Sequence, residues 1–323
     1  MKRIIITALI AVVLTSCGDK GKDSLPAISG KAGEVEVVAN KALWESEPGA
    51  AIRDLLAQVC PFLPQPEEMY DLFNVPPKAF NKLFKAHRNI IYLNVSEDKS
   101  QPALEVKYNV WAEPQLVIYI QAPDAASVTK LINEQGKTIL ESISTAELNR
   151  LLAAGKNYEE KEPGKQVRAL MGGSPKFPTG YSTKKITDDF VWVSYESTYT
   201  NQSILVYKYP YTGPEQFTAE ALAAKRNEFT KQNIPCTKEG SYVIINPMIA
   251  PGFEMKTYNG KEFAELRGLW DAYNDYMGGP FVSHAFLDKT KENIIVVDAF
   301  VYAPKYPKRS YIRQVESILY SYE

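Results

Sequence analysis

The residues of this 323-residue chain whose types could act together as an acid–base site lie between positions 265 and 288. Arg267, Asp271 and Asp275 fall on an expected helix, and His284 follows after a Gly-Gly-Pro turn. An aspartate beside an imidazole orients it for proton transfer, which is the chemistry a hydrolase would need. The simpler interpretation is that the aspartates lie on a solvated helix face and His284 is an ordinary strand residue, because spacing along the chain sets no distance between them. We therefore treat them as candidates for a ligand site and assign no catalytic residue.

An aromatic stripe is the second candidate. Leu205, Tyr207 and Tyr209 alternate onto one face of an expected strand. If the tyrosine rings are exposed, they could stack on the apolar faces of sugar rings. If they are buried, they are ordinary core residues, because aromatic side chains suit a half-buried sheet face. Tyr207 and Tyr209 are therefore candidates for glycan binding, with a core role as the alternative.

The sharpest signatures of catalysis and metal binding are missing from the sequence. It holds no HExxH, Walker A, GxSxG or CxxC pattern. The chain has 2 histidines, so no multi-histidine metal site is expected, and no cofactor is implied. The balance of 37 basic and 38 acidic residues offers no case for nucleic acid binding, which needs a clustered basic surface. A hydrophobic share of 45% is typical of a folded protein.

The N-terminus carries the most specific functional signal. Two basic residues precede an apolar run from Ile4 to Leu14, which is too short for a bilayer that needs about 20 helical residues. A charged start and a short apolar core are typical of an export signal that is removed. The closing Leu-Thr-Ser-Cys17 resembles the lipobox of bacterial lipoproteins, in which the cysteine carries lipid. We expect residues 1–16 to be a signal peptide and Cys17 to anchor the protein in the cell envelope, at the outer membrane, on a face that the sequence does not specify.

Changes in composition divide the mature chain. Residues 17–33 are rich in Gly, Lys, Asp and Ser and lack apolar periodicity, so they predict a flexible tether. A charged, loop-like stretch between residues 155 and 187 separates two patterned regions. We expect an N-terminal half at 34–165 and a C-terminal half at 166–323.

Two cysteines remain if Cys17 carries lipid. Cys60 and Cys236 both adjoin proline, and they would form an even pair in an oxidising compartment. They could close one long disulfide loop. The alternative is two separate buried thiols, because free cysteine is among the most buried residue types. Spacing along the chain does not decide between these interpretations.

Three stretches of the chain repeat one arrangement, in which two alternating strands are followed by a proline-marked connection and an amphipathic helix. Hairpins that must bury one face beneath a following helix predict antiparallel sheets with helices packed on one face. We therefore expect an α+β fold with two similar-sized halves. The units are strands 104–111 and 115–121 with a helix from 125, strands 190–195 and 203–209 with a helix at 217–232, and strands 281–287 and 293–302 with a helix at 308–320.

Further elements are expected outside these units. Alternation predicts a strand at 34–39, a buried strand is expected at 89–95 and a short strand at 242–245, and apolar spacing predicts a helix at 50–59. Pro77 should open a helix whose apolar face ends at His87, a histidine for which a core role is expected. A helix is also expected at 261–277, because Phe263, Leu266 and Trp270 fall at helical spacing before Gly-Gly-Pro.

The chain as a whole resembles a family of uncharacterised lipoproteins from Bacteroidota, the domain of unknown function 4837. The resemblance rests on the lipobox Cys17, on the first-half segment DLLAQVCPFLPQPEEMYDLFNVPPKAFNKLFKAHRNIIYLNV, and on RGLW and NDYMGGPFVSHAFLD in the second half. It implies the phylum, export and a lipid anchor. The family has no assigned activity, so the resemblance supplies no catalytic residue.

Together these features predict a lipid-anchored envelope protein that is an interaction or structural accessory rather than an enzyme. Its expected partners are the membrane, through Cys17, and an envelope protein complex or a glycan. A glycan- or small-ligand-binding lipoprotein that uses the tyrosine stripe is the alternative. An envelope hydrolase that uses His284 is the third hypothesis.

Overall fold

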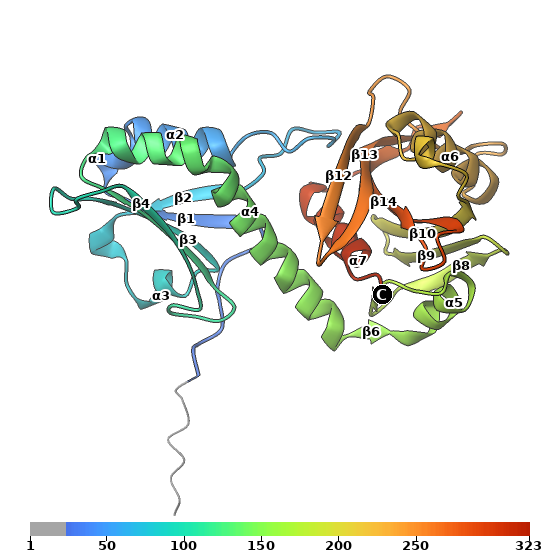
Figure 1. Cartoon of the computed structure of the whole chain (residues 1–323), viewed down its shortest axis with the longest axis horizontal. Helices are drawn as coiled ribbons and strands as arrows, with labels where there is room; N and C mark the ends of the chain where they lie inside the picture. The colour runs from blue at the N-terminus through green and yellow to red at the C-terminus, as the bar shows by residue number, and fades with distance from the viewer. Residues whose placement is uncertain (1–23) are drawn as a thin grey trace, which may run out of the picture.

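The computed structural model describes residues 24–323, which form two large sheets, each with its own hydrophobic core, and a separate two-stranded pair (Figure 1). The α+β class in two halves is thus confirmed. The expected signal peptide, Cys17 and the first part of the expected tether lie outside the described residues. The described part of that tether is bound to the first half, because Ser29 N–H donates to the Ala86 carbonyl over 2.8 Å. The folded body therefore begins before residue 34, earlier than expected.

The first sheet has five strands in the order β2-β1-β3-β5-β4. The pairs β1–β2, β1–β3 and β3–β5 are parallel, and only β4–β5 is antiparallel. The expectation of antiparallel pairing is therefore wrong for most of this half. The connections between its parallel strands are long enough to return the chain to the same end of the sheet. The strands are β1 (Glu34–Val38), β2 (Asp71–Val75), β3 (Asn89–Val95), β4 (Ala103–Tyr108) and β5 (Leu116–Ala122).

Helices α2 (Glu47–Leu56) and α4 (Ala125–Asn157) cover one face of this sheet. The Asp124 carboxylate caps α4 by accepting from Ser127 N–H at 2.7 Å. Figure 1 shows α4 running from the first half towards the second. The helix expected from Pro77 to His87 is wrong: it is replaced by two short turns, because the Asn81 side chain caps a new turn by accepting from Leu83 N–H. The two turns are the 3₁₀ turn η1 (Pro77–Ala79) and α3 (Lys82–Lys85), and a further short helix, α1 (Lys41–Trp44), precedes α2.

The second sheet is antiparallel throughout, as expected for this half, in the order β11-β13-β14-β15-β10-β9-β8, with β12 also paired to β13. Its strands are β8 (Ser182–Ile186), β9 (Phe190–Glu196), β10 (Asn201–Pro210), β11 (Tyr242–Ile245), β12 (Gly252–Tyr258), β13 (Lys261–Tyr273), β14 (Gly278–Leu287) and β15 (Asn293–Tyr302). A separate two-stranded pair joins β6 (Glu159–Glu160) to β7 (Phe177–Pro178).

Helices cover both faces of the second sheet, whereas one covered face was expected. α5 (Lys161–Met171) and α7 (Arg309–Tyr320) pack on the face that carries Val191 and Val193. α6 (Ala219–Asn233), which follows the 3₁₀ turn η2 (Pro214–Gln216), packs on the opposite face. Strand residues alternate between the two faces, and here both alternating sets are apolar, so both need a cover. The division expected after residue 165 falls inside α5, whose Val167 packs in the core of the second half.

The largest error of the sequence-based assignment concerns residues 261–277. The expected helix is instead β13, one of the longest strands. Ala264, Leu266 and Trp270 pack in one core, while Phe263 and Arg267 contact Tyr320 and Glu316 of α7. The hairpin between β12 and β13 turns at Asn259 and Gly260, which both have positive φ. Asn-Gly is the preferred pair for a two-residue hairpin turn, so this dipeptide was the local signal for strands.

Candidate functional site

The open face of the first sheet carries the candidate site. Ile91 and Leu93 of β3 point into the core beneath α2 and α4, so Tyr92 and Asn94 point to the opposite face. No helix as long as α2 or α4 covers that opposite face among residues 24–323. Phe80 and Trp111 pack over part of it and leave the rest accessible. The sheet thus presents side chains from three neighbouring strands to the surface.

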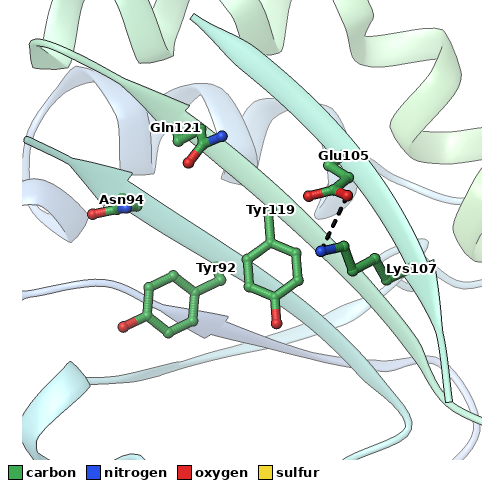
Figure 2. Close-up of a pocket in the computed structure, with 6 residues that line it drawn as sticks. All are labelled: Tyr92, Asn94, Glu105, Lys107, Tyr119 and Gln121. Carbon is green, nitrogen blue, oxygen red and sulfur yellow. Dashed lines mark ion pairs between the residues drawn. The ribbon is translucent and has the colours of Figure 1, made fainter. Parts of the chain in front are cut away.

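A shallow depression of about 380 Å³ lies on this face, and we refer to it as the β3–β4–β5 concavity. Figure 2 shows its floor, where each of the three strands contributes two side chains. The lining combines two phenol rings, two carboxamides and one ion pair. It consists of Tyr92, Asn94, Glu105, Lys107, Tyr119 and Gln121.

The strand registers bring these side chains together. Tyr92 is aligned with Tyr119 and Asn94 with Gln121 in the parallel β3–β5 pair. Glu105 lies opposite Tyr119 in the antiparallel β4–β5 pair. Residues two apart on a strand share a face, so each strand adds a row of two functional groups. The concavity is therefore a direct product of sheet pairing.

The two rings form the centre of the concavity. Their centroids are 5.9 Å apart, and their planes are inclined by 36°. Lys107 Nζ lies 5.3 Å from the centroid of the Tyr119 ring and 3.1 Å from Glu105 Oε1. Partial burial, with smaller contributions from Glu105 and Tyr92, raises the pKa of Tyr119 above its ordinary value. The lining offers aromatic faces and hydrogen-bonding groups, which suit binding.

Sequence reasoning missed this site, although a signal for it exists. The segments Tyr92-Leu93-Asn94 and Tyr119-Ile120-Gln121 repeat a pattern of tyrosine, aliphatic residue and amide. Both segments lie on expected strands. Their functional meaning depends on the two strands being adjacent and in register, which the pattern alone does not determine.

The tyrosine stripe is core. Tyr207 is 1% exposed and Tyr209 is 6% exposed. The Tyr207 ring stacks on Phe229 of α6 with centroids 4.3 Å apart. The α6 helix therefore covers the face on which an exposed platform was considered, and the core alternative holds.

His284 has a carboxylate neighbour, but it is Glu265 rather than an aspartate. The two residues face each other across the β13–β14 pair, with His284 Nε2 3.3 Å from Glu265 Oε2. Both are buried, with 3% and 5% of their surface exposed. Burial lowers the pKa of His284 and outweighs the opposing effect of Glu265, so the imidazole is neutral at pH 7. A substrate in solvent would not reach this pair.

Arg267 belongs to the same buried ionic cluster. Its guanidinium lies 3.2 Å from Glu265 Oε1 and also pairs with Glu316 of α7. Lys256 Nζ lies 2.8 Å from Glu265 Oε1. Burial alone would raise the pKa of Glu265, but His284, Arg267 and Lys256 together hold it well below its usual range. The cluster joins β12, β13 and α7.

Asp271 and Asp275 are placed elsewhere, so the structure does not assemble the expected Asp–His site. Asp271 accepts a hydrogen bond from the Asn246 amide at 2.7 Å. Asp275 follows β13 in a turn, and Lys238 Nζ lies 3.8 Å from it. Asp271 lies opposite Gly278 at the C-terminal end of β13, whereas the β13 residue that lies opposite His284 is Glu265.

The two cysteines of the described region are not bonded to each other. Cys60 and Cys236 are free, half-buried thiols, so the long disulfide is wrong. Burial raises the pKa of the Cys236 thiol to about 11. Between residues 24 and 323, no group of three or more His, Cys, Asp or Glu side chains is arranged to hold a metal ion. Within the same range, no helix combines the length and apolar character needed to span a bilayer.

Comparisons with known proteins identify three regions of the chain. A family described as "Domain of unknown function (DUF4837)" matches residues 160–321, which is half of the chain. A different family, described as "Domain of unknown function (DUF8532)", matches residues 28–155, which include the first-half segment of the expected resemblance. A prokaryotic membrane lipoprotein lipid attachment site matches residues 1–17. The chain is accordingly a lipid-anchored protein of the cell envelope.

Two solved structures show a limited likeness to this chain. One is a point mutant of the protein Mog1, with 12% identity, a TM-score of 0.32, and coverage of 47% of this chain and 89% of that one. The other is the Saccharomyces cerevisiae Ran-binding protein Mog1p, with 13% identity, a TM-score of 0.29 and the same coverage. No match was found among curated proteins.

Proposed function

Because the chain belongs to the family described as "Domain of unknown function (DUF4837)", whose description states no activity, we propose a function from its own geometry. The protein is a non-catalytic, lipid-anchored binding protein that holds a neutral glycan in the β3–β4–β5 concavity. The observation that carries this proposal is the pair of adjacent tyrosine rings flanked by two carboxamides on an open sheet face.

Sugar rings match this lining in two ways. Their C–H faces are apolar and pack on aromatic rings, as Tyr92 and Tyr119 would allow. Their hydroxyl groups donate and accept hydrogen bonds, and the Asn94 and Gln121 amides can do both. The Glu105–Lys107 pair is already neutralised internally, which favours a ligand without net charge. The shallow, open shape suits one segment of a longer polymer.

The anchor supports this role. Two or three acyl chains on Cys17 would exceed the single chain that gives only marginal membrane binding. We place the anchor in the outer membrane of a Bacteroidota cell, where a binding protein would meet envelope or surface glycans. The charged residues that follow Cys17 resemble export signals of that phylum and support this placement.

The test is binding of a soluble Cys17→Ala form to arrayed neutral oligosaccharides. Tyr92→Ala and Tyr119→Ala should each weaken binding about fivefold, because the loss of one stacked ring costs about 1 kcal/mol. Tyr108→Ala is the matched control, since Tyr108 is an exposed tyrosine of β4 outside the concavity. Unchanged affinity in Tyr119→Ala, or an equal loss in Tyr108→Ala, would contradict the proposal.

A further inference from the structure

β12 is a free edge of the second sheet. It pairs with β13 over all seven of its residues, from Gly252 with Arg267 to Tyr258 with Lys261. β11 lies along the same side of β13, farther towards its end, and therefore does not cover β12. Among residues 24–323, no strand or isolated bridge pairs with the outer side of β12. Its outward backbone groups are available to another strand.

The side chains of this edge are unusual for a strand left open to water. Phe253 is 37% exposed and Met255 is 55% exposed. The preceding loop adds Met248 and Ile249, which are also exposed. Soluble proteins usually protect an edge with charged side chains, proline, a bulge or a covering element. β12 carries Glu254 and Lys256 but contains no proline, and its register with β13 is continuous. Such an edge is suited to pairing with a further strand.

The order of charges along β12 selects the partner. We propose that β12 pairs antiparallel with β12 of a second copy of this chain, about a two-fold axis at Met255. In this register Glu254 of one copy lies opposite Lys256 of the other, and the symmetry repeats that pair. Opposite charges at directly opposed positions stabilise a strand pair, whereas like charges oppose it. A two-fold axis also requires the same patch on both copies, which a self-complementary strand provides.

Other registers do not place Glu254 of one copy opposite Lys256 of the other. With the axis at Glu254 or at Lys256, a like pair faces itself across the interface. A parallel arrangement would place each Glu254 opposite its own equivalent. With the axis at Met255, Phe253 lies opposite Thr257 and Gly252 lies opposite Tyr258. The Phe62 ring of the same chain lies against Gly252, so the contact between the copies is centred on Phe253 to Thr257.

Within one chain the two charged residues are already close to one another. Lys256 Nζ lies 3.6 Å from Glu254 Oε2 and 2.8 Å from Glu265 Oε1. Pairing of two copies would therefore extend an existing ionic cluster and create no unpaired charge. The eight strands of each copy would join in one continuous antiparallel sheet. Anchoring of both copies in one membrane raises their effective concentration and favours the contact.

The test is site-specific cross-linking of the lipidated protein in its own membranes, with Cys60 and Cys236 replaced by serine. Met255→Cys should give a covalent dimer after mild oxidation with copper phenanthroline, because directly opposed Cβ atoms are about 5 Å apart. Thr257→Cys is the matched control, since the two equivalent positions would be about 14 Å apart in this register. Co-expression of Phe253→Cys with Thr257→Cys should restore the dimer.

The outcomes separate this proposal from its alternatives. Strong cross-linking of Met255→Cys, with at least a tenfold weaker signal from Thr257→Cys, supports the β12 pair. Equal cross-linking at both positions indicates random collision and overturns it. Absence of any dimer from Met255→Cys, with unchanged thermal unfolding showing that the variant is folded, also overturns it. A cross-link to a different protein at position 255 would assign the edge to another partner and refute self-pairing.

Discussion

The buried carboxyl group of Glu36 should make the stability of this protein strongly dependent on pH. Glu36 lies in β1, aligned with Phe73 of β2 and Ile90 of β3, and it is 0% exposed. Neither of its carboxyl oxygens has a hydrogen-bond partner among the described residues. Burial raises its pKa from 4.5 to about 8. The folded protein therefore holds this group protonated at neutral pH.

The sign and size of the effect follow from proton linkage. Between pH 4.5 and about 8 the folded state binds one more proton at Glu36 than the unfolded state does. The contribution of Glu36 to the free energy of unfolding is therefore greatest below pH 4.5, and it falls as pH rises from 4.5 to about 8. The slope is about 1.4 kcal/mol per pH unit. Between pH 5 and pH 8 the free energy of unfolding should fall by about 3 kcal/mol because of Glu36.

The assay is urea unfolding of the soluble Cys17→Ala form at several values between pH 5 and pH 8. Glu36→Gln imitates the protonated group and cannot ionise, so the stability difference between it and the parent should grow by about 3 kcal/mol across this range. The other titrating groups are common to both proteins and cancel in the difference. Glu36→Asp, which keeps an ionisable group, should retain most of the slope while being less stable throughout.

A difference between parent and Glu36→Gln that stays constant with pH would refute this reasoning. It would mean that Glu36 has the same pKa in the folded and unfolded states and is therefore ionised in the folded protein across this range. A difference that shrinks as pH rises would show that the carboxylate makes a favourable charged contact. Either result would require a different account of the environment of the Glu36 carboxyl group in β1.

Two further predictions concern the anchor and a buried ion pair. Cys17→Ala should move the protein from the membrane fraction to the soluble fraction of fractionated cells; continued membrane association would contradict lipid anchoring through this residue. Asp298→Asn should lower the free energy of unfolding by about 3–5 kcal/mol, because it leaves the fully buried Arg226 guanidinium without its counter-charge. Glu45→Gln, which removes the partner of Lys41 in a pair whose two side chains are both largely exposed, should cost less than about 1 kcal/mol in the same urea experiment. Similar losses in both variants would mean that burial does not determine how much an ion pair contributes to the free energy of unfolding.

Local patterns in the sequence predicted several of the individual elements. Short apolar runs at residues 89–95 and 293–302 predicted β3 and β15, and the apolar spacing in residues 308–320 predicted α7. These patterns depend on the direction in which consecutive side chains point, which is a property of the backbone alone. The lipid attachment sequence ending at Cys17 is equally local, because a short motif is sufficient for its recognition.

The same reasoning failed where the apolar residues of one segment fit both the helical and the strand period. Phe263, Leu266 and Trp270 satisfy a helical spacing, but the segment is β13. Its residues are buried on both faces of the sheet, so strand alternation is hidden. The Asn259-Gly260 turn was the better guide. This error also affected the acid–base site expected from the sequence. A helix would bring Asp271 towards His284, whereas the strand places Glu265 opposite His284.

By itself the sequence determined the export signal, the lipid anchor, the α+β class and most individual strands. Only the tertiary structure decided which strands are neighbours. That choice buried Tyr207 under α6 and placed Tyr92 beside Tyr119 on an open face. The physical reason is that exposure and proximity depend on contacts between segments distant in the chain. Each tyrosine follows the same local alternation, and only the packing of helices against one face or both separates a core residue from a binding surface.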